Sequence, residues 1–340
     1  MNRAANSNKF IAASAAEVIF LDRAQTIPPV HGQPAPIRLI LPATSANLGP
    51  GFDAVGLALA LTLTIEAEVN TEPDAPALVI EATGRNSDRV SRTTNNMIFE
   101  TYRDVLAHAG KPVLPLRLRI QNEIPLGMGC GSSAAALLAG VMLANHFGGL
   151  GWPVAACIDE ASRREGHPDN VAACALGGFT VSAVDESGAV VAATSGADLP
   201  WKLFLALPST SLATERARAL LPSAYSRADA VANIQRVALL VAAFGQGRGD
   251  LLRIAMQDRL HQPYRMEACP LLPRLLPLAG EPGVQGVALS GAGPGMLIVA
   301  ARDADAERLI ARIRAAAGDP DLEVVETRIR SGASQAVIEG

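Results

Sequence analysis

The sequence predicts an α+β protein made of two domains, and three observations support this fold class. Strands are expected in pairs and helices in separate runs, unlike the strict alternation of a parallel α/β sheet. The 340 residues suit one large or two medium domains, and an apolar share of 49% provides a sizeable core. A new strand begins just after Pro200. We therefore expect an N-terminal extension at 1–36 and two domains at 37–200 and 201–340.

The first 36 residues are interpreted as an extension, with a targeting segment as the alternative. An apolar stretch at 11–21 is interrupted by Glu17 and followed by Asp22, and it has no clean cleavage pattern. Two proline-rich runs, 27–30 and 33–36, are typical of a linker. The folded body is therefore expected to begin at Ile37.

Apolar periodicity predicts the elements of the first domain. A short apolar strand at 37–43 is followed by a polar loop at 44–52. Further strands are expected at 61–69, 78–82 and 116–121, with a hairpin at 179–193. Helical spacing or Ala/Leu-rich composition predicts helices at 96–109, 134–145 and 153–165.

The second domain begins with a strand at 203–207. Helices are then expected at 215–221, 227–244 and 251–257. A strand, a glycine-rich loop and a second strand occupy 286–300, and a helix at 304–317 precedes a last strand at 322–328. No internal repeat is visible in the chain.

Charge and cysteine usage exclude several classes of protein. The net charge is −4 and no basic block is present, which argues against nucleic acid as a partner. Four cysteines are scattered without a CxxC pair, which fits reduced thiols and a cytoplasmic location. No apolar run approaches the ~20 residues of a membrane span, so no membrane partner is expected.

The glycine-rich stretch between Pro125 and Ala136 is the first candidate site. It lies between an expected strand and an expected helix, so free backbone N–H groups and the helix dipole converge on one point. An anion such as a phosphate is the natural occupant, and Ser132 and Ser133 can add hydroxyl groups. The alternative is a plain glycine turn into a buried helix.

Two better-known glycine motifs fit this stretch poorly. A Walker loop requires a lysine after its glycines, and the three lysines of the chain are all elsewhere. A dinucleotide fingerprint requires Gly or Ala where Ser132 stands, and an acid about 20 residues later, where 148–153 has none.

Four further clusters carry polar chemistry: 42–53, 165–170, 290–295, and an arginine pair in 214–218 and 258–265. Each has a purely structural alternative, namely a capping Asp53, a helix-ending turn, a backbone turn and a solvated helix face. Taken together, the glycine loops suit a polyphosphate, the carboxylates suit Mg²⁺ or an ammonium group, and the arginines suit a carboxylate.

These stretches resemble the three signature motifs of the GHMP kinases, whose ATP loop also lacks a Walker lysine. The runs 42–53, 165–172, 214–222 and 258–265 resemble the homoserine kinases of that superfamily, in a consistent order from Ile37 to the C-terminus. The resemblance implies a ribosomal-S5-like N-terminal domain and a ferredoxin-like C-terminal domain. It also implies phosphorylation of L-homoserine by MgATP to O-phospho-L-homoserine, a step toward threonine, and a homodimer.

The resemblance implies a set of nucleotide and metal residues. The ATP-binding residues would be Pro125, Gly127, Gly129, Gly131, Ser132, Ser133, Asn95 and Asn96. Ser133 and Glu165 would bind Mg²⁺, with Glu160 as a rival.

The same resemblance implies a substrate site with separate groups for each end of homoserine. Asp53 and Asp169 suit the ammonium, whereas Arg218 and Arg265 suit the carboxylate. Others would orient the substrate or close the site: Asn47, His167, Asn170, Thr214, Gly291 and Gly293. Asp169, Asn170 and Ser133 would be catalytic. Whether Asp169 is a general base or holds the ammonium stays open at this point.

Three residues depart from the family pattern, and two other functions compete. Cys130 and Met128 stand in the glycine loop where the family has other residues, and Gly295 replaces a common Thr.

The competing functions are a GHMP kinase for a different alcohol and a non-catalytic regulator. The acid and arginine set argues against the first, and the retained Glu165 and Asp169 argue against the second.

Overall fold

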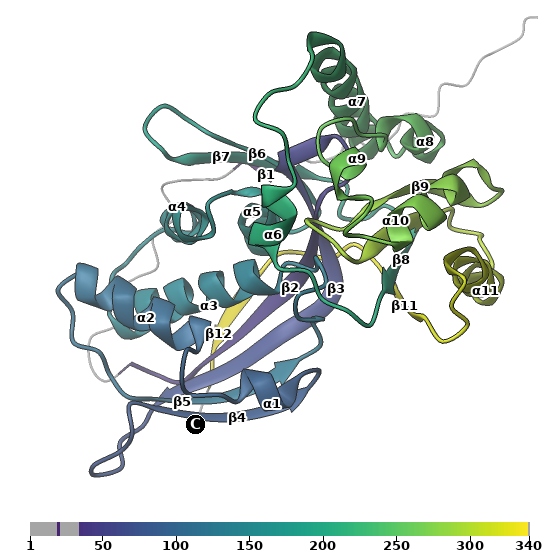
Figure 1. The fold of residues 1–340 in the computed structure, drawn as a ribbon. Coiled ribbons are helices and arrows are strands. Elements are labelled where there is room, and N and C mark those ends of the chain that lie inside the picture. The colour runs from purple at the N-terminus through teal and green to yellow at the C-terminus, as the bar shows by residue number, and fades with distance from the viewer. Residues whose placement is uncertain (1–18, 21–33, 339–340) are drawn as a thin grey trace, which may run out of the picture.

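A computed structural model describes residues 19–20 and 34–338 of the chain. Apart from residues 19–20 and 34–36, the expected extension lies outside the described residues. The described chain forms two β-sheets with helices around them, so the predicted α+β class is confirmed (Figure 1). The break between the two sheets falls between Ser195 and Lys202.

The first sheet has eight strands and is organised around one long strand, β3 (Gly51–Val69). β3 pairs antiparallel with β2 (Ile37–Asn47) along its length, with β6 through residues 55–57, and with β5 through residues 63–69. The path β1-β7-β6-β3-β2-β12 continues on both sides, and β4 lies parallel to β5. The remaining strands are β1 (Ile19–Phe20), β4 (Leu78–Gly84), β5 (Leu116–Asn122), β6 (Phe179–Val184), β7 (Val190–Ser195) and β12 (Ser334–Val337).

The prediction of a loop at 44–52 is wrong, because β2 continues to Asn47 and β3 already begins at Gly51. Glycine, proline and asparagine in this stretch disfavour strands locally. Pairing of the two long strands overrides that preference, since strand formation depends on cross-strand context. The polar cluster therefore sits at the tip of a rigid hairpin.

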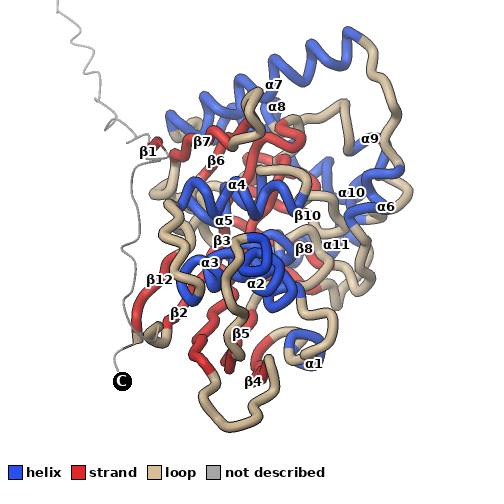
Figure 2. Tube along the Cα trace, turned by 90° about the vertical axis from the view of Figure 1, so that its left-hand side faces the viewer, coloured by secondary structure: helices blue, strands red, loops and turns tan. Residues whose placement is uncertain are grey.

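Helices cover one face of the first sheet (Figure 2). The largest is α3 (Ser132–Phe147), most of whose residues are buried between the sheet and the neighbouring helices. The other helices of this domain are α1 (Ser87–Val90), α2 (Met97–His108), α4 (Val154–Glu165) and α5 (Asp169–Leu176). The opposite face carries exposed ion pairs such as Arg38–Glu66 and Arg117–Glu72.

The helix α5 was not expected from the sequence. Pro168 suggested that a helix ends in a turn, and α4 does end at Glu165. The same proline is the N-cap of the next helix, α5, where its missing N–H costs nothing. The stretch from Glu165 to Asn170 is therefore a tight junction between two helices.

The second sheet is antiparallel, with the strand order β11-β8-β10-β9. Its apolar core includes Phe204, Leu272 and Ile313. The strands are β8 (Lys202–Leu207), β9 (Val284–Leu289), β10 (Met296–Ala300) and β11 (Glu323–Thr327). The helices of this half are α6 (Thr214–Ala219), α7 (Arg227–Gln246), η1 (Gly249–Leu251), α8 (Leu252–Ala255), α9 (Gln262–Arg265), α10 (Leu271–Leu275), η2 (Leu276–Gly280) and α11 (Ala306–Ala317). The chain then returns to the first sheet, where β12 pairs with β2.

The helix α7 stands out at the top of the molecule (Figure 1). Within the described residues it is the one helix long and apolar enough to cross a membrane, judged by length and composition alone. Its most apolar window is only 22% buried.

Two glycine loops pack against each other where the two halves of the chain meet. Gly129 precedes α3 with a φ of 75°, and a Cβ atom on it would lie 2.0 Å from the carbonyl oxygen of Ser290. The Ser290 hydroxyl donates a hydrogen bond to the Gly129 carbonyl oxygen at 2.8 Å. The Gly295 N–H donates to the Met128 carbonyl oxygen, and the Gly291 N–H to that of Ala46. This approach leaves no room for a side chain at Gly129.

We predict that Gly129→Ala destabilises the protein far more than Gly149→Ala. Both glycines have a positive φ, but a Cβ on Gly149 would meet nothing within 4 Å. The Gly149 change should cost about 1–2 kcal/mol, the usual cost of a left-handed residue. The Gly129 change should cost several kcal/mol more, because a methyl group collides with backbone. Urea unfolding of both variants measures the difference, and equal costs would show that the loops do not pack closely.

Candidate active site

One cleft between the two halves gathers the polar clusters of the sequence. It is bounded by the β2–β3 hairpin tip, the glycine loop before α3, the junction between α4 and α5, the elements α6 and α9, and the loop after β9. The cleft-lining residues are Asn47, Phe52, Asp53, Gly127, Gly129, Cys130, Gly131, Ser132, Ser133, Glu165, His167, Asp169, Asn170, Leu212, Thr214, Arg218, Arg265, Gly291, Ala292 and Gly293. All ten residues expected to bind substrate line this cleft.

The glycine loop presents backbone N–H groups to the cleft. Gly127, Gly129 and Gly131 all have a positive φ, which allows the tight turns of this loop. Gly131 is the N-cap of α3 and supplies no side-chain cap. The N–H groups of the first turn therefore remain available for an anion, and the helix dipole favours negative charge there.

Ser133 and Glu165 lie together on the cleft wall. The Ser133 hydroxyl donates a hydrogen bond to Glu165 Oε2 at 2.8 Å. Burial raises the pKa of Glu165, and the Ser133 hydrogen bond offsets this only in part. Glu160 does not line the cleft and pairs instead with Arg163 and Arg164. Oxygen donors of this type suit a hard cation, so Ser133 and Glu165 are the better placed pair.

Asp169 begins α5 and is almost fully buried. Its Oδ1 accepts hydrogen bonds from His167 Nδ1 at 2.6 Å and from the Asn170 backbone and side chain. Burial lowers the pKa of His167, but the hydrogen bond and negative charge of Asp169 outweigh it, so the pKa is raised overall. The Thr44 hydroxyl fixes Asn170 by donating to its Oδ1 at 2.7 Å. Asp169 and Asn170 are thus held in fixed orientations.

Asp53 and Arg218 pair with each other. Arg218 donates two hydrogen bonds to the Asp53 carboxylate, at 3.0 and 2.5 Å. The sequence interpretation treated these side chains as separate ligands, and the fold joins them across the cleft. Asn47 supports the pair, because its Oδ1 accepts from the Asp53 N–H and its Nδ2 donates to the Gly291 carbonyl oxygen.

A small cation fits next to this pair. Ligand atoms of Asp53, His167 and Asp169 all lie within 4.8 Å of one another. Two carboxylates at this spacing can hold either a metal ion or an ammonium group.

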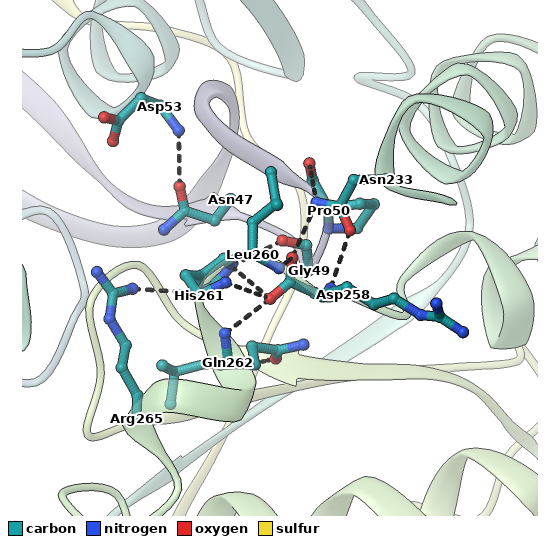
Figure 3. A network of polar contacts seen from close by, with 12 residues as sticks. Asn47, Gly49, Pro50, Asp53, Asn233, Asp258, Leu260, His261, Gln262 and Arg265 are labelled. Carbon is teal, nitrogen blue, oxygen red and sulfur yellow. Dashed lines mark hydrogen bonds and ion pairs between the residues drawn. The ribbon is translucent and has the colours of Figure 1, made fainter. Parts of the chain in front are cut away.

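Arg265 also lines the cleft and is 1% exposed, with its guanidinium group beside His261 (Figure 3). Phe52 lies beside both guanidinium groups: its ring centroid is 5.4 Å from the Cζ atom of Arg218 and 5.7 Å from that of Arg265. The sequence interpretation assigned no role to Phe52 or to His261, which bonds Arg265. Phe52 lies within the cluster 42–53 and His261 within the cluster 258–265, but no pattern in the sequence shows that either side chain contacts an arginine.

A second hollow adjoins the cleft through the glycine loop. It shares Gly127, Ser132 and Ser133 with the cleft, and it contains both Asn95 and Asn96. Apolar side chains form much of its wall: Leu63, Val90, Met97, Ile98, Ile124 and Leu126. Asn96 caps α2 by accepting from the Phe99 N–H, so its side chain is already engaged. Pro125 lines neither the hollow nor the cleft.

Comparison with known families gives matches to both halves of the chain. Residues 96–178 match the GHMP kinases N terminal domain, and residues 240–319 match the GHMP kinases C terminal domain. The homoserine kinase of Solibacter usitatus is 46% identical over 77% of this chain and 84% of its own length. That of Synechocystis is 40% identical over 76% of this chain and 84% of its own length.

Solved structures show the same two-domain fold. A putative homoserine kinase from Listeria monocytogenes has a TM-score of 0.70 at 30% identity, covering 89% of this chain and 100% of its own. The homoserine kinase from Cytophaga hutchinsonii has a TM-score of 0.75 at 23% identity, covering 90% and 99%. The expected two-domain GHMP kinase fold is confirmed, and the family implies ATP as co-substrate. This chain therefore belongs to the homoserine kinases of the GHMP kinase superfamily.

Proposed function

We propose that the protein phosphorylates the hydroxyl group of L-homoserine with ATP, giving O-phospho-L-homoserine and ADP, a step toward threonine. One observation carries the assignment to an amino-acid substrate. A phosphate-binding loop opens into a cleft that, besides Glu165, holds the carboxylates of Asp53 and Asp169 and the guanidinium groups of Arg218 and Arg265. Such a set matches the ammonium and the carboxylate of one zwitterion. Mevalonate has no ammonium, so these acids would disfavour it.

ATP spans the hollow and the cleft in this proposal. The apolar wall of the hollow suits a purine, and Asn95 is the better candidate for contacts to the nucleoside because Asn96 is engaged as a cap. The triphosphate runs past Ser132 and Ser133, which line both spaces. The N–H groups at the start of α3 then contact its terminal oxygens.

Homoserine binds on the far side of the cleft. Its ammonium lies between Asp53 and Asp169, whose ligand atoms are within 4.8 Å of one another. Its carboxylate lies against Arg218 and Arg265 through charge-assisted hydrogen bonds. Asn170 and Thr214 orient the remaining atoms, with Asn170 nearest the hydroxyl. This arrangement directs the hydroxyl toward the glycine loop.

Mg²⁺ fits the Ser133 and Glu165 pair. A hydroxyl and a carboxylate are hard oxygen donors, and among the described residues no arginine or lysine forms an ion pair with Glu165. When bound, Mg²⁺ neutralises charge on the phosphates. The Ser133 hydroxyl and the Glu165 carboxylate would hold it beside the phosphate loop.

The chemical step needs positioning and charge stabilisation. The homoserine oxygen forms a bond to the γ-phosphorus while the bond from that phosphorus to the bridging oxygen of ADP breaks. N–H groups of the glycine loop stabilise the charge on the transferred group. In this proposal Asp169 holds the ammonium, so the hydroxyl proton passes to the transferred phosphoryl group.

A coupled assay of ADP release with MgATP tests the function. We expect turnover with L-homoserine well above that with mevalonate, L-serine or L-threonine. Mevalonate has no ammonium group, and the hydroxyl groups of serine and threonine lie one carbon closer to the charged groups than the hydroxyl of homoserine does. Reactions without enzyme or without acceptor are the controls. ATP binding without homoserine-dependent turnover would contradict the proposal and indicate a different acceptor.

Asp169→Asn separates ammonium binding from general base catalysis. We predict that the KM for homoserine rises about tenfold or more, since a charge-assisted bond is lost, while kcat falls only a few-fold. The exposed residue Asp74, replaced by Asn, is the matched control. A large loss of kcat at an unchanged KM would instead make Asp169 the base.

We also propose that the enzyme is a cytoplasmic homodimer joined through α7. Val231, Ile234 and Val241 are 46%, 65% and 39% exposed, and with Ala238 they follow the spacing of one helix face. No charged residue occurs from 237 to 247. Two antiparallel copies of α7 would set opposite ends of the helix dipole against each other. A second copy of this chain is therefore the partner that fits this face.

Ile234→Glu is predicted to convert the dimer to a monomer, because it places a charge at the centre of the apolar face. Light scattering after size exclusion measures the mass, and Val113→Glu, an exposed apolar residue elsewhere, is the control. A monomeric native protein, or one that sediments with membranes, would contradict this interface.

A further inference from the structure

We propose that His261 is a positioning residue: with its proton on Nε2, it holds the Arg265 guanidinium in place for the carboxylate of the substrate. The inference deepens the proposed function and rests on it for the identity of that substrate. Four observations carry it: the environment of Arg265, the hydrogen bonds of His261, the frame around that histidine, and its contact with the other half of the chain.

Arg265 is a buried cation without an anionic partner close by. Within the described residues no carboxylate lies within 4.0 Å of its guanidinium nitrogens. Its Nε donates to the Ala217 carbonyl oxygen at 3.2 Å, and a terminal nitrogen donates to His261 Nδ1 at 2.9 Å. A buried charge of this kind is costly unless an anion joins it. The cleft is the place where such an anion can bind.

The two hydrogen bonds of His261 define its protonation. Its Nε2 lies 2.7 Å from the carbonyl oxygen of Gly49, which can only accept, so Nε2 carries the proton. A guanidinium can only donate, so Nδ1 must be the bare acceptor for Arg265. Both bonds require the neutral ring. Burial lowers the pKa of His261 more than the nearby Asp258 raises it, which is consistent with this state.

Asp258 fixes the turn that carries the histidine (Figure 3). Its carboxylate accepts from the backbone N–H groups of Leu260, His261 and Gln262, and from Asn233 of α7 at 2.9 Å. This set fixes the backbone that carries the His261 ring, and the ring itself is held by its Gly49 and Arg265 bonds. It also stacks on Phe52, with 5.4 Å between ring centroids.

Gly49 belongs to the other half of the chain, at the β2–β3 hairpin tip. His261 therefore connects three parts of the site: the hairpin tip, the turn before α9, and Arg265. Arg265 has one hydrogen bond to backbone and one to this ring. Loss of the ring nitrogen would leave the guanidinium free to turn away, so substrate binding should weaken while the phosphate side of the cleft stays intact.

Three substitutions at His261 test the proposal. His261→Phe keeps a ring but removes both hydrogen bonds, His261→Asn keeps an acceptor near Nδ1, and His261→Gln keeps a donor near Nε2. We expect His261→Phe to raise the KM for homoserine about tenfold or more, with kcat and the KM for ATP changed about threefold or less. Asn should recover more of the lost affinity than Gln. The exposed His108, replaced by Asn, is the control, and thermal unfolding checks that each variant is folded.

A coupling measurement distinguishes positioning from a structural role. In an Arg265→Met background, His261→Phe should change the homoserine KM no further, because its effect acts through the arginine. With 3-aminopropanol, which lacks the carboxylate, His261→Phe should leave the rate unchanged. Additive effects, or equal losses with both substrates, would overturn the proposal.

The tautomer provides a readout that does not depend on activity. Nitrogen-15 spectra of the histidines in the native protein should show a His261 ring protonated at Nε2 and bare at Nδ1. A ring protonated at Nδ1 would overturn the proposal even in an active enzyme. A wild-type protein inactive on homoserine but with the expected tautomer would instead overturn the proposed function and leave the His261–Arg265 contact standing.

Discussion

The close contact between two glycine loops is the constraint on which the rest of the site depends. The loop before α3 and the loop after β9 come from different halves of the chain, and they meet backbone to backbone at Gly129 and Ser290. Because no side chain separates them, the loop before α3 lies directly against the loop that joins β9 and β10. Both loops line the cleft, which is formed around this contact.

Charge balance is the second constraint: some charged groups of the cleft have a partner of opposite charge, and others do not. Asp53 is paired with Arg218, and Asp169 with His167. Glu165 has a hydroxyl group as its hydrogen-bond partner, and Arg265 has a carbonyl oxygen and a neutral ring. The incompletely balanced groups thus have opposite signs: the Glu165 carboxylate beside the glycine loop and the Arg265 guanidinium. A metal cation and a substrate carboxylate would complete them, which is why the cleft suits ATP and an amino acid together.

The two halves of the chain also share their hydrogen-bond networks. Asn47 and Gly49 belong to a hairpin of the first sheet, yet their partners Gly291 and His261 belong to the second half. Asn170 is held by the Thr44 hydroxyl and Arg265 by the His261 ring, in each case through a neutral side chain. Such supporting contacts hold these side chains of the cleft in one orientation.

The sequence by itself determined the α+β class, most of the helices and the groups of residues that form the cleft. Helical spacing marked α2 and Ala/Leu-rich composition marked α3, and the glycine, acid and arginine clusters indicated phosphate, cation and carboxylate chemistry. Local patterns could not show that the polar loop at 44–52 is a hairpin tip, or that Pro168 begins α5, because pairing and helix packing decide these points.

Only the tertiary structure paired Asp53 with Arg218, placed Glu165 rather than Glu160 in the cleft, and connected His261 to Arg265. Residues 165 and 160 are equally good ligands in the sequence. They point to different surroundings because α4 turns its side chains to different faces. Partners such as Gly49 and His261 are 212 positions apart, and such distant pairs have no local signal. The chemical type of each residue can therefore be taken from the sequence, whereas the neighbours, burial and protonation of that residue depend on the fold.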